Sequence, residues 1–425
     1  MQTRRNMRRR PEIVNFALPL AGFHPRLPAR VLNHLQKPGV SMIRAVFTTA
    51  LPFAGLLLAG GIAVAEPLGD DVNGALLRPN QAAVARAIGG MDPESALPAA
   101  LAELNSSGTR LAYSSLAGEG IASARTMLLD DSAFLSRGIL RRGSGAVETS
   151  AFGDTGLFWL DGESRRLHGS GDGNFATSGF RSSGIRLGAD SDWDGLRAGV
   201  AIGYNDGSFN SRDRHTSATA DGLHAGVYAL GERGGWNLSG GWTYARYDLD
   251  DDRAVPMEET MRVRGSSSAS AHRLFAEATR PVQLEVVELE PVLGITQTFF
   301  HADRFRERGA VAALGVDDAD ASLTTLRLGA RGIWNVDIGP YPVTARLGAG
   351  WEGNMGDRST PLTAAFAGST AFRARGIELP ENLLDIEASV SIAALRNGTV
   401  QMGYGGRFGD DFEDHRGRVT VEIRF

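Results

Sequence analysis

The last nine residues, "GRVTVEIRF", alternate strictly between apolar and polar side chains. Because successive side chains of a β-strand point to opposite faces, a period of two predicts a strand with one apolar and one charged face. The apolar face carries Val419, Val421, Ile423 and Phe425. Soluble sheets show the same alternation, so the rest of the chain has to decide where such a strand lies.

The same period recurs through residues 144–425. The sequence predicts twelve strands there, at about 155–168, 179–190, 195–206, 220–231, 234–247, 270–281, 288–301, 322–336, 340–352, 383–395, 398–408 and 417–425. A mean hydropathy of -0.14 excludes a polytopic helical membrane protein, which needs several apolar runs of about 20 residues. Strands that bury only alternate residues remain compatible with a membrane.

The connections between these strands alternate between short and long. "SDWD" and "RN" are short, whereas "DGSFNSRDRHTSATAD" and "HADRFRERGAVAALGVDDADAS" are long. Short turns on one rim and long loops on the other are typical of an outer-membrane barrel. We therefore predict an all-β membrane barrel of twelve antiparallel transmembrane strands, with aromatic girdles that include Phe158, Trp159, Trp236, Tyr244, Phe300 and Trp351.

A helical segment, residues 81–143, precedes the strands. Its stretch from Gly120 to Leu140 is expected to form one helix of about 30 Å, at 1.5 Å per residue. Four charged residues make this helix too polar for lipid: Arg125, Asp130, Asp131 and Arg137. We expect it in the barrel lumen, where inward glycines such as Gly188, Gly203 and Gly348 leave room and where Arg346 and Arg407 pair with its acids.

A signal peptide is predicted at residues 42–65. Arg44 is followed by an apolar run and by the small-x-small cleavage site formed by Ala63 and Ala65. Translation is then expected to begin at Met42, which makes residues 1–41 an upstream extension that is not native. Residues 66–80 would be a residual passenger or linker.

Composition excludes several classes of function. A net charge of -5 gives no basis for nucleic-acid binding, and the absence of Cys excludes disulfides and Cys-ligated metals. No hydrolase elbow, zinc helix or phosphate loop occurs, so we expect no catalytic residues, metals or cofactors. His215, His301 and His415 stand beside acids in predicted loops, which leaves a rim-located hydrolase as a weak alternative.

Residues from about Asn80 to Phe425 resemble the C-terminal translocator of a classical autotransporter, the barrel of type V secretion. The resemblance rests on "SLAGEGIASARTMLLDDSAFL", "LRAGVAIGYNDGSF", "GLHAGVYAL", "LEPVLGITQTFFHADRFRERG" and "GYGGRFGDDFEDHRGRVTVEIRF", in this order. It implies a Gram-negative outer-membrane barrel plugged by its N-terminal helix, which carries an upstream passenger to the cell surface.

The resemblance also implies partners. These are outer-membrane lipid and lipopolysaccharide, the barrel assembly machinery, periplasmic chaperones, and the Sec translocon during export. Val419, Val421, Ile423 and Phe425 match the family's assembly signal. Only Glu66 to about Arg78 separates the signal peptide from the translocator, so the expected product is truncated or passenger-less. A passive pore is the alternative that would require the helix to leave the lumen.

Overall fold

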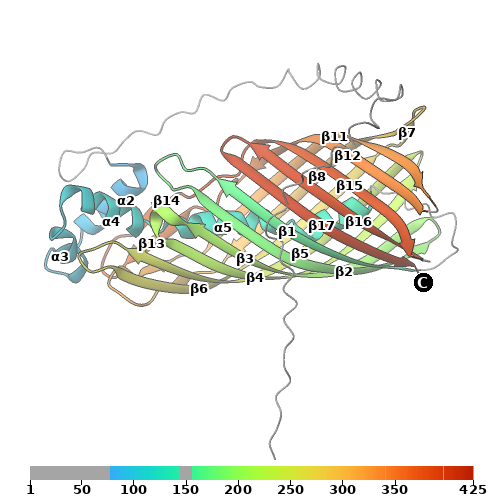
Figure 1. Cartoon of the computed structure of the whole chain (residues 1–425). Coiled ribbons are helices and arrows are strands. Elements are labelled where there is room, and N and C mark those ends of the chain that lie inside the picture. Colours follow the sequence, from blue (N-terminus) through green and yellow to red (C-terminus); the bar gives the residue numbers. More distant parts are fainter. Residues whose placement is uncertain (1–76, 144–155, 340, 396, 425) are drawn as a thin grey trace, which may run out of the picture. The chain divides into compact units, whose positions relative to one another are not determined.

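The computed structural model describes residues 77–143, 156–339, 341–395 and 397–424 (Figure 1). The predicted upstream extension, the signal peptide with Ala63 and Ala65, and the terminal Phe425 lie outside the described residues. The predictions made for them stay predictions.

Twelve antiparallel strands form a closed barrel, as the alternation predicts. Each predicted strand is present, and the strands are β1 (Leu157–Gly169), β2 (Ser178–Trp193), β3 (Leu196–Ser211), β4 (Thr216–Arg233), β5 (Trp236–Val255), β6 (Met261–Thr279), β8 (Glu288–Ala302), β11 (Ala319–Ile338), β12 (Tyr341–Gly356), β15 (Asn382–Leu395), β16 (Gly398–Gly409) and β17 (Phe412–Arg424). A two-residue strand, β7 (Val282–Gln283), extends the hairpin into β8.

The barrel closes where its last strand pairs with its first. β17 pairs with β1 along its whole length, from Leu157 opposite Arg424 to Gly169 opposite Phe412. β8 pairs with β11 across the long connection between them. With β17 paired on both sides, Val419 and Ile423 are half-exposed on the outer wall, at 47% and 45%. The apolar row of the last strand therefore faces outward, because the other row of a closed barrel's strand faces the lumen.

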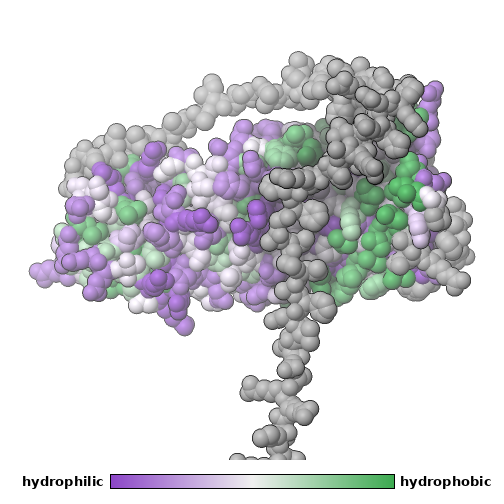
Figure 2. All heavy atoms as spheres, in the orientation of Figure 1, coloured by the Kyte–Doolittle hydropathy of each residue, from purple (hydrophilic) through white to green (hydrophobic). Residues whose placement is uncertain are grey.

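The outer wall is divided into an apolar and a polar part. Figure 2 shows hydrophobic residues gathered toward the end where the chain terminates, and hydrophilic residues toward the end that carries α2 and α4. Exposed apolar side chains cover the first part, including Val200, Ile202, Leu223, Leu274, Ile295 and Leu347. The apolar part is the surface that a membrane would cover.

The strands are longer than the alternation predicted. β5 has 20 residues, which at about 3.3 Å per residue exceeds twice the roughly 25 Å of an apolar band. The stretch "DGSFNSRDRHTSATAD" is mostly strand, and the turn is confined to the 3-10 helix η2 (Arg212–Arg214) and His215. The expectation of a long loop there is wrong, because its polar residues line strands that stand clear of the apolar band.

The two rims differ in how they connect the strands. The long-loop rim carries the connections at 170–177, 212–215, 256–260, 303–318, 357–381 and 410–411. The short-turn rim carries the others, among them two-residue turns at Asp194-Gly195 and Gly234-Gly235, with positive φ at all four residues. Positive φ at both central residues suits the right-handed twist of a hairpin. The start of β1 and the end of β17 lie at the short-turn rim.

A cap covers the long-loop rim. It consists of the helices α2 (Pro79–Gly89), α3 (Ala96–Ala102) and α4 (Ser106–Leu116), and a four-stranded sheet of β9 (Phe305–Arg306), β10 (Leu314–Val316), β13 (Leu362–Phe366) and β14 (Phe372–Ala374). These elements share one hydrophobic core, which includes Val84, Leu116, Leu314 and Leu362. The cap is therefore a folded unit, built from the segment before the barrel and from two of its long loops.

Two helices follow the cap where one was expected. They are α5 (Glu119–Asp131) and α6 (Phe134–Gly143), and the helix breaks at Ser132, whose hydroxyl donates to the carbonyl of Leu129. All thirteen residues of α5 are buried, and both helices contact inner strand faces. None of the helices described here has the length and apolar character needed to cross a membrane.

Most inward glycines leave room for side chains of the barrel wall and not for the lumenal helices. A Cβ at Gly188 would overlap the ring of Trp159, and one at Gly199 would meet Tyr228. Of the predicted glycines Gly188, Gly203 and Gly348, only Gly203 approaches α6, where a Cβ would lie 3.1 Å from Phe134. The large inward side chains, rather than the helix, require most of these glycines.

Two of the predicted girdle aromatics face inward. Trp159 is fully buried and donates from its indole nitrogen to Tyr228 Oη at 2.9 Å, and Phe300 is 2% exposed in the lumenal core. Phe158, next to Trp159, is the residue that faces out. Adjacent strand residues point to opposite faces, so only one member of each aromatic pair could lie in the girdle.

Candidate functional site: the lumenal plug

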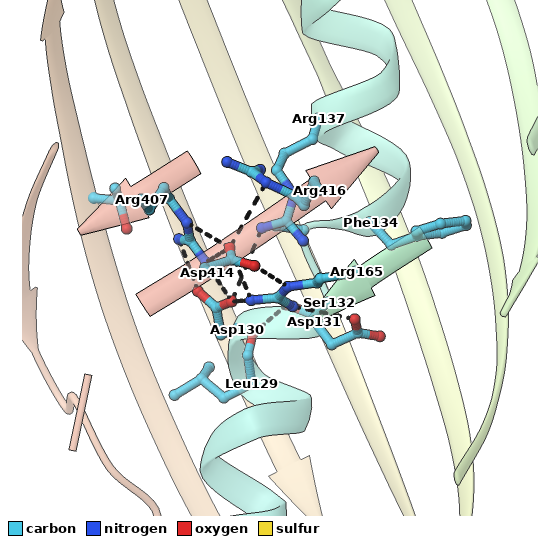
Figure 3. A network of polar contacts seen from close by, with 12 residues as sticks. Leu129, Asp130, Asp131, Ser132, Phe134, Arg137, Arg165, Arg407, Asp414 and Arg416 are labelled. Carbon is cyan, nitrogen blue, oxygen red and sulfur yellow. Dashed lines mark hydrogen bonds and ion pairs between the residues drawn. The ribbon is translucent and has the colours of Figure 1, made fainter. Parts of the chain in front are cut away.

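Asp130 lies at the centre of an ionic network between α5 and the barrel wall (Figure 3). Arg407 on β16 donates from Nη1 to Oδ1 at 3.0 Å and from Nη2 to Oδ2 at 2.7 Å. Arg165 on β1 also pairs with Asp130. Asp414 on β17 joins both arginines, at 2.8 Å from Arg165 Nε and 2.8 Å from Arg407 Nη2. One carboxylate of the helix is thus held to β16 and β1, and Asp414 links the two arginines from the strand between them.

Asp131 points to the opposite side of the same turn. Arg165 Nη1 lies 3.2 Å from its Oδ1, and Asn205 on β3 donates to its Oδ2 at 2.7 Å. Ser182 on β2 and Tyr247 on β5 donate to it at 3.2 Å each. Together the two aspartates bond side chains of five strands of the wall, and Asp414 adds β17 through the arginines.

The network is buried, and Glu352 on β12 extends it, because its Oε1 lies 3.0 Å from Arg407 Nη1. Asp130, Asp131 and Asp414 face Arg165 and Arg407, while Arg137 of α6 lies 4.0 Å from Asp130 and Arg416 lies 3.7 Å from Asp414. Buried charges are tolerated when paired and hydrogen-bonded, and removal of one partner leaves the other uncompensated. The arrangement therefore fixes the position of the helix and makes it sensitive to the loss of any one member.

The predicted partner Arg346 does not take part. None of the ion pairs among the described residues joins Arg346 to Asp130 or Asp131, and its strongest charged neighbours are Glu290 and Glu422. Arg346 stands nearer the short-turn end of β12, where it pairs in register with Ser389. Position along the strand, which a one-dimensional pattern does not supply, separates it from Arg407.

Sequence reasoning missed Arg165, Asp414 and Arg416 as members of this network. Each lies on the inward row of its strand. In β17 that row consists of Phe412, Asp414, Arg416, Arg418 and Thr420. The alternation of a charged inward row was the available signal. The strand predicted at 417–425 is too short, because β17 begins at Phe412 and so includes Asp414 and Arg416.

The second helix, α6, is held at the short-turn end. Arg142 pairs with Asp190, donates to Tyr228 Oη at 2.8 Å and lies 3.3 Å from Glu422. Arg141 Nη2 lies 2.9 Å from Glu163. Arg186 on β2 bonds the carbonyl of Phe134 at the start of α6, with its guanidinium carbon 4.4 Å from the centre of the Phe134 ring.

The predicted plug residue Arg125 contacts backbone rather than carboxylates. Its Nη2 donates to the carbonyl of Asp303 at 2.9 Å and its Nη1 to that of Asp317 at 3.3 Å. Both carbonyls belong to the connection between β8 and β11. Arg125 thereby ties α5 to one of the loops of the cap.

The start of α5 is fastened to the cap by Glu119. Its Oε1 accepts from the backbone nitrogen of Ala176 at 2.7 Å and lies 2.8 Å from Arg214 Nε, while Oε2 accepts from Asn80 Nδ2 at 3.1 Å. Asn80 also bonds Asn174 and Arg375. Burial raises the pKa of Glu119 to about 7, and the charge of Arg214 and these hydrogen bonds offset part of that effect.

A loop from the long-loop rim also enters the lumen beside α5. In the connection 357–381, the backbone nitrogen of Ile377 donates to Ser123 Oγ at 3.1 Å. The backbone nitrogen of Thr360 donates to Thr126 Oγ1 at 3.1 Å. Small residues on this face of α5 allow the close approach. The helix is therefore covered by strands at its sides and by loops at its outer end.

A vestibule remains open at the short-turn end of the lumen. Its volume is about 790 Å³, and the residues that line it include Arg141 and Arg142 of α6 together with inward residues of β11, β12, β16 and β17. It exists because α6 packs toward β3, β4, β5 and β6 and leaves the opposite wall uncovered. The plug is thus tight around α5 and looser around α6.

The three loop histidines do not form a common site. His301 on β8 pairs with Asp303 and Asp320, at 3.3 and 2.8 Å, and His415 on β17 contacts Tyr404 at 2.7 Å. β8 and β17 are not neighbours in the barrel, and His215 lies in the turn before β4. Within the described ranges, no group of three or more His, Asp or Glu side chains is placed to hold a metal ion.

The family model of the autotransporter beta-domain matches residues 158–405, which is most of the barrel. The chain belongs to the autotransporter β-domain family. Its barrel is therefore an outer-membrane translocator barrel of Gram-negative bacteria, as the resemblance implied. Because the chain belongs to this family, the position and direction of its lumenal helices bear on how the barrel functions.

The chain is similar to two relatives of known sequence and to two solved structures. Two extracellular serine proteases of Serratia marcescens are 27% identical over 267 and 264 residues, 60% of this chain and 25% of each relative. The chain thus spans about a quarter of their length.

The translocator domain of the autotransporter NalP from Neisseria meningitidis has the same fold, with a TM-score of 0.55, 16% identity and coverage of 69% of this chain and 98% of that one. The beta domain of the Bordetella autotransporter BrkA covers 64% of this chain and 100% of that one, at 20% identity and a TM-score of 0.49.

Proposed function

We propose that this autotransporter barrel carries the polypeptide on the N-terminal side of α5 through its lumen to the cell surface, and that α5 and α6 then remain as the plug. The observation that carries the proposal is the direction of the helices. Glu119 lies beside Arg214 at the long-loop rim, and Arg142 lies beside Asp190 and Glu422 at the short-turn rim. A segment joined to the start of α5 therefore stands at the rim opposite to the ends of the barrel sequence.

Delivery and assembly follow the same proposal. The chain would be exported by the Sec translocon and escorted by periplasmic chaperones. The barrel assembly machinery would then insert it, reading the terminal row of Val419, Val421, Ile423 and Phe425. Lipid and lipopolysaccharide would cover the apolar outer wall. The catalytic activity named for the Serratia relatives is proposed to belong to the parts of those proteins that this chain does not match.

A reporter domain joined ahead of Pro79 tests the proposal. In intact cells, external protease should digest the reporter while the barrel still migrates as a heat-modifiable species. A matched insertion of the same reporter in the turn at Asp194-Gly195 should stay protected until the outer membrane is permeabilised. Protection of the first reporter in cells whose barrel has assembled would contradict the proposal.

A further inference from the structure

Two arginines stand side by side on the outer wall. Arg166 on β1 and Arg181 on β2 are paired in register, and both are exposed. Among the described residues, neither guanidinium forms an ion pair or a hydrogen bond that would offset the other charge. Like charges directly opposite one another in a sheet are destabilising. An anion from outside the chain would offset the repulsion between the two charges.

The arginines stand just beyond the apolar part of the wall. Four residues closer to the short-turn rim, Gly162 on β1 and Ile185 on β2 are paired, and Val419 on β17 lies opposite Gly162. Ile185 is 53% exposed and Leu160 is 40% exposed. Acyl chains that cover these side chains would bring their head groups level with Arg166 and Arg181, because an arginine stem follows apolar surface while its charge stays at the interface.

Small residues lie between the apolar edge and the arginines. Ser164 pairs with Ser183 on one side and with Gly417 on the other. A Cβ added at Gly417 would meet no atom within 4 Å, so the wall is open there. Two hydroxyls and a bare backbone thus form a floor on which a head group can rest beneath the two guanidinium groups.

The neighbouring residues complete one side of this surface. His415 lies opposite Arg166 on β17, and Tyr404 Oη lies 2.7 Å from His415 Nδ1, with the Tyr404 side chain 39% exposed. Two acids stand at the border of this surface, and each is bonded to one of its residues. Asp206 accepts from Ser183 Oγ at 3.0 Å, and Glu413 lies 4.0 Å from His415.

We propose that this surface, defined by Ser164, Arg166, Arg181, Ser183, His415 and Gly417, binds the phosphorylated head group of an outer-leaflet lipid of the lipopolysaccharide type. Guanidinium groups bind phosphate through charge-assisted, often bidentate hydrogen bonds. The exposed row below them accepts the acyl chains of the same molecule. The proposal rests on the proposed function, which puts the long-loop rim at the cell surface, and adds to it a specific lipid contact on three strands at the seam where the barrel closes.

The test uses the full chain, purified in detergent and titrated with phosphorylated lipid A, with bound lipid counted by native mass spectrometry. The double variant R166Q/R181Q should bind about 30-fold more weakly, since each arginine near an anionic lipid surface contributes about fivefold to the affinity. Arg246→Gln is the matched control, because Arg246 is also exposed, on β5, beside the apolar edge, and its one bond to a described side chain is to Ser268. It should bind as the wild type does.

Dephosphorylated lipid A provides a comparison that needs no variant. The wild-type chain should bind it as weakly as the double variant binds the phosphorylated form, and inorganic phosphate should compete only far above the lipid concentration. Equal binding of both lipid forms, an equal loss in R246Q, or full competition by phosphate at lipid concentrations would each overturn the proposal. Heat-modifiable migration of each variant establishes that its barrel has folded.

Discussion

Arg407 holds Asp130 through both of its Nη atoms, at 3.0 and 2.7 Å, and so joins β16 of the barrel wall to α5 in the lumen (Figure 3). Asp414 lies between Arg407 and Arg165 and binds both. The helix is therefore fixed to the same part of the wall in which the last strands of the barrel close. Closure of the barrel and retention of the plug depend on shared residues.

Replacing Asp130 and Asp131 by Asn should loosen the plug. Loss of one side of a buried ionic network leaves its partners uncompensated, at a cost of about 3–5 kcal/mol. Single-channel recordings of the double variant in planar bilayers should show channel openings. Such openings should be rare or absent in recordings of the wild type.

Arg407→Ala should have the same effect on conductance, whereas Arg346→Ala should leave it near the wild-type level. Both arginines face the lumen, so the comparison separates loss of a specific ion pair from loss of lumenal charge. Equal conductance of the two variants would contradict the assignment of Arg407 as the partner of Asp130.

The fastening at Glu119 should weaken as pH rises. The folded state raises the pKa of Glu119 from 4.5 to about 7, so its contribution is fully present below pH 4.5 and is lost as pH rises through 7. Protease cleavage within residues 77–118, normalised at each pH to an unfolded peptide, should increase several-fold between pH 5 and pH 8. In Glu119→Gln this increase should disappear. A wild-type profile as flat as that of the variant would refute the role of this carboxyl.

A methyl group at Gly188 should disturb the inner wall. Because a Cβ there would overlap the ring of Trp159, Gly188→Ala should displace the indole from Tyr228 and cost about 1–3 kcal/mol. Gly162→Ala is the control, since the nearest atom to a Cβ at that position is 4.0 Å away. Urea unfolding in detergent measures both, and similar free energies of unfolding would show that the Gly188–Trp159 contact is not needed.

Deleting Phe425 should impair assembly more than folding. Burial of one terminal ring at a lipid interface contributes only about 2 kcal/mol, which is small for a closed twelve-stranded barrel. The shortened chain should accumulate unassembled in the periplasm yet refold in detergent with nearly normal yield. If refolding fails to the same degree as assembly in cells, the terminal residue acts through stability and not as a signal.

The strands and the barrel class could be predicted because they depend on local patterns. Alternation, turn residues and connection lengths are all readable within a few residues of one another, and the paired glycines at 234–235 mark a turn without reference to the rest of the fold. The lumenal helix was predictable for a similar reason: Asp130 and Asp131 exclude it from lipid.

The rest depends on contacts between distant segments. The partner of Asp130 is set by the height of Arg407 along β16, and Trp159 faces inward because Gly188 on the next strand makes room for it. The cap joins helices near residue 100 to strands near residue 365 through one apolar core. No local pattern reports these pairings, so neither the cap nor Arg165, Asp414 and Arg416 was predicted.

The central claim is that α5 and α6 run through the barrel with the preceding helices at the cell surface. The natural chain has no Cys, so single cysteines can be placed and labelled without background. Ser107→Cys on α4 and Asp192→Cys at the short-turn rim are both exposed. In intact cells a membrane-impermeant maleimide should label Ser107→Cys, and it should label Asp192→Cys only after the outer membrane is permeabilised. Labelling of Asp192→Cys but not of Ser107→Cys in intact cells would contradict the account.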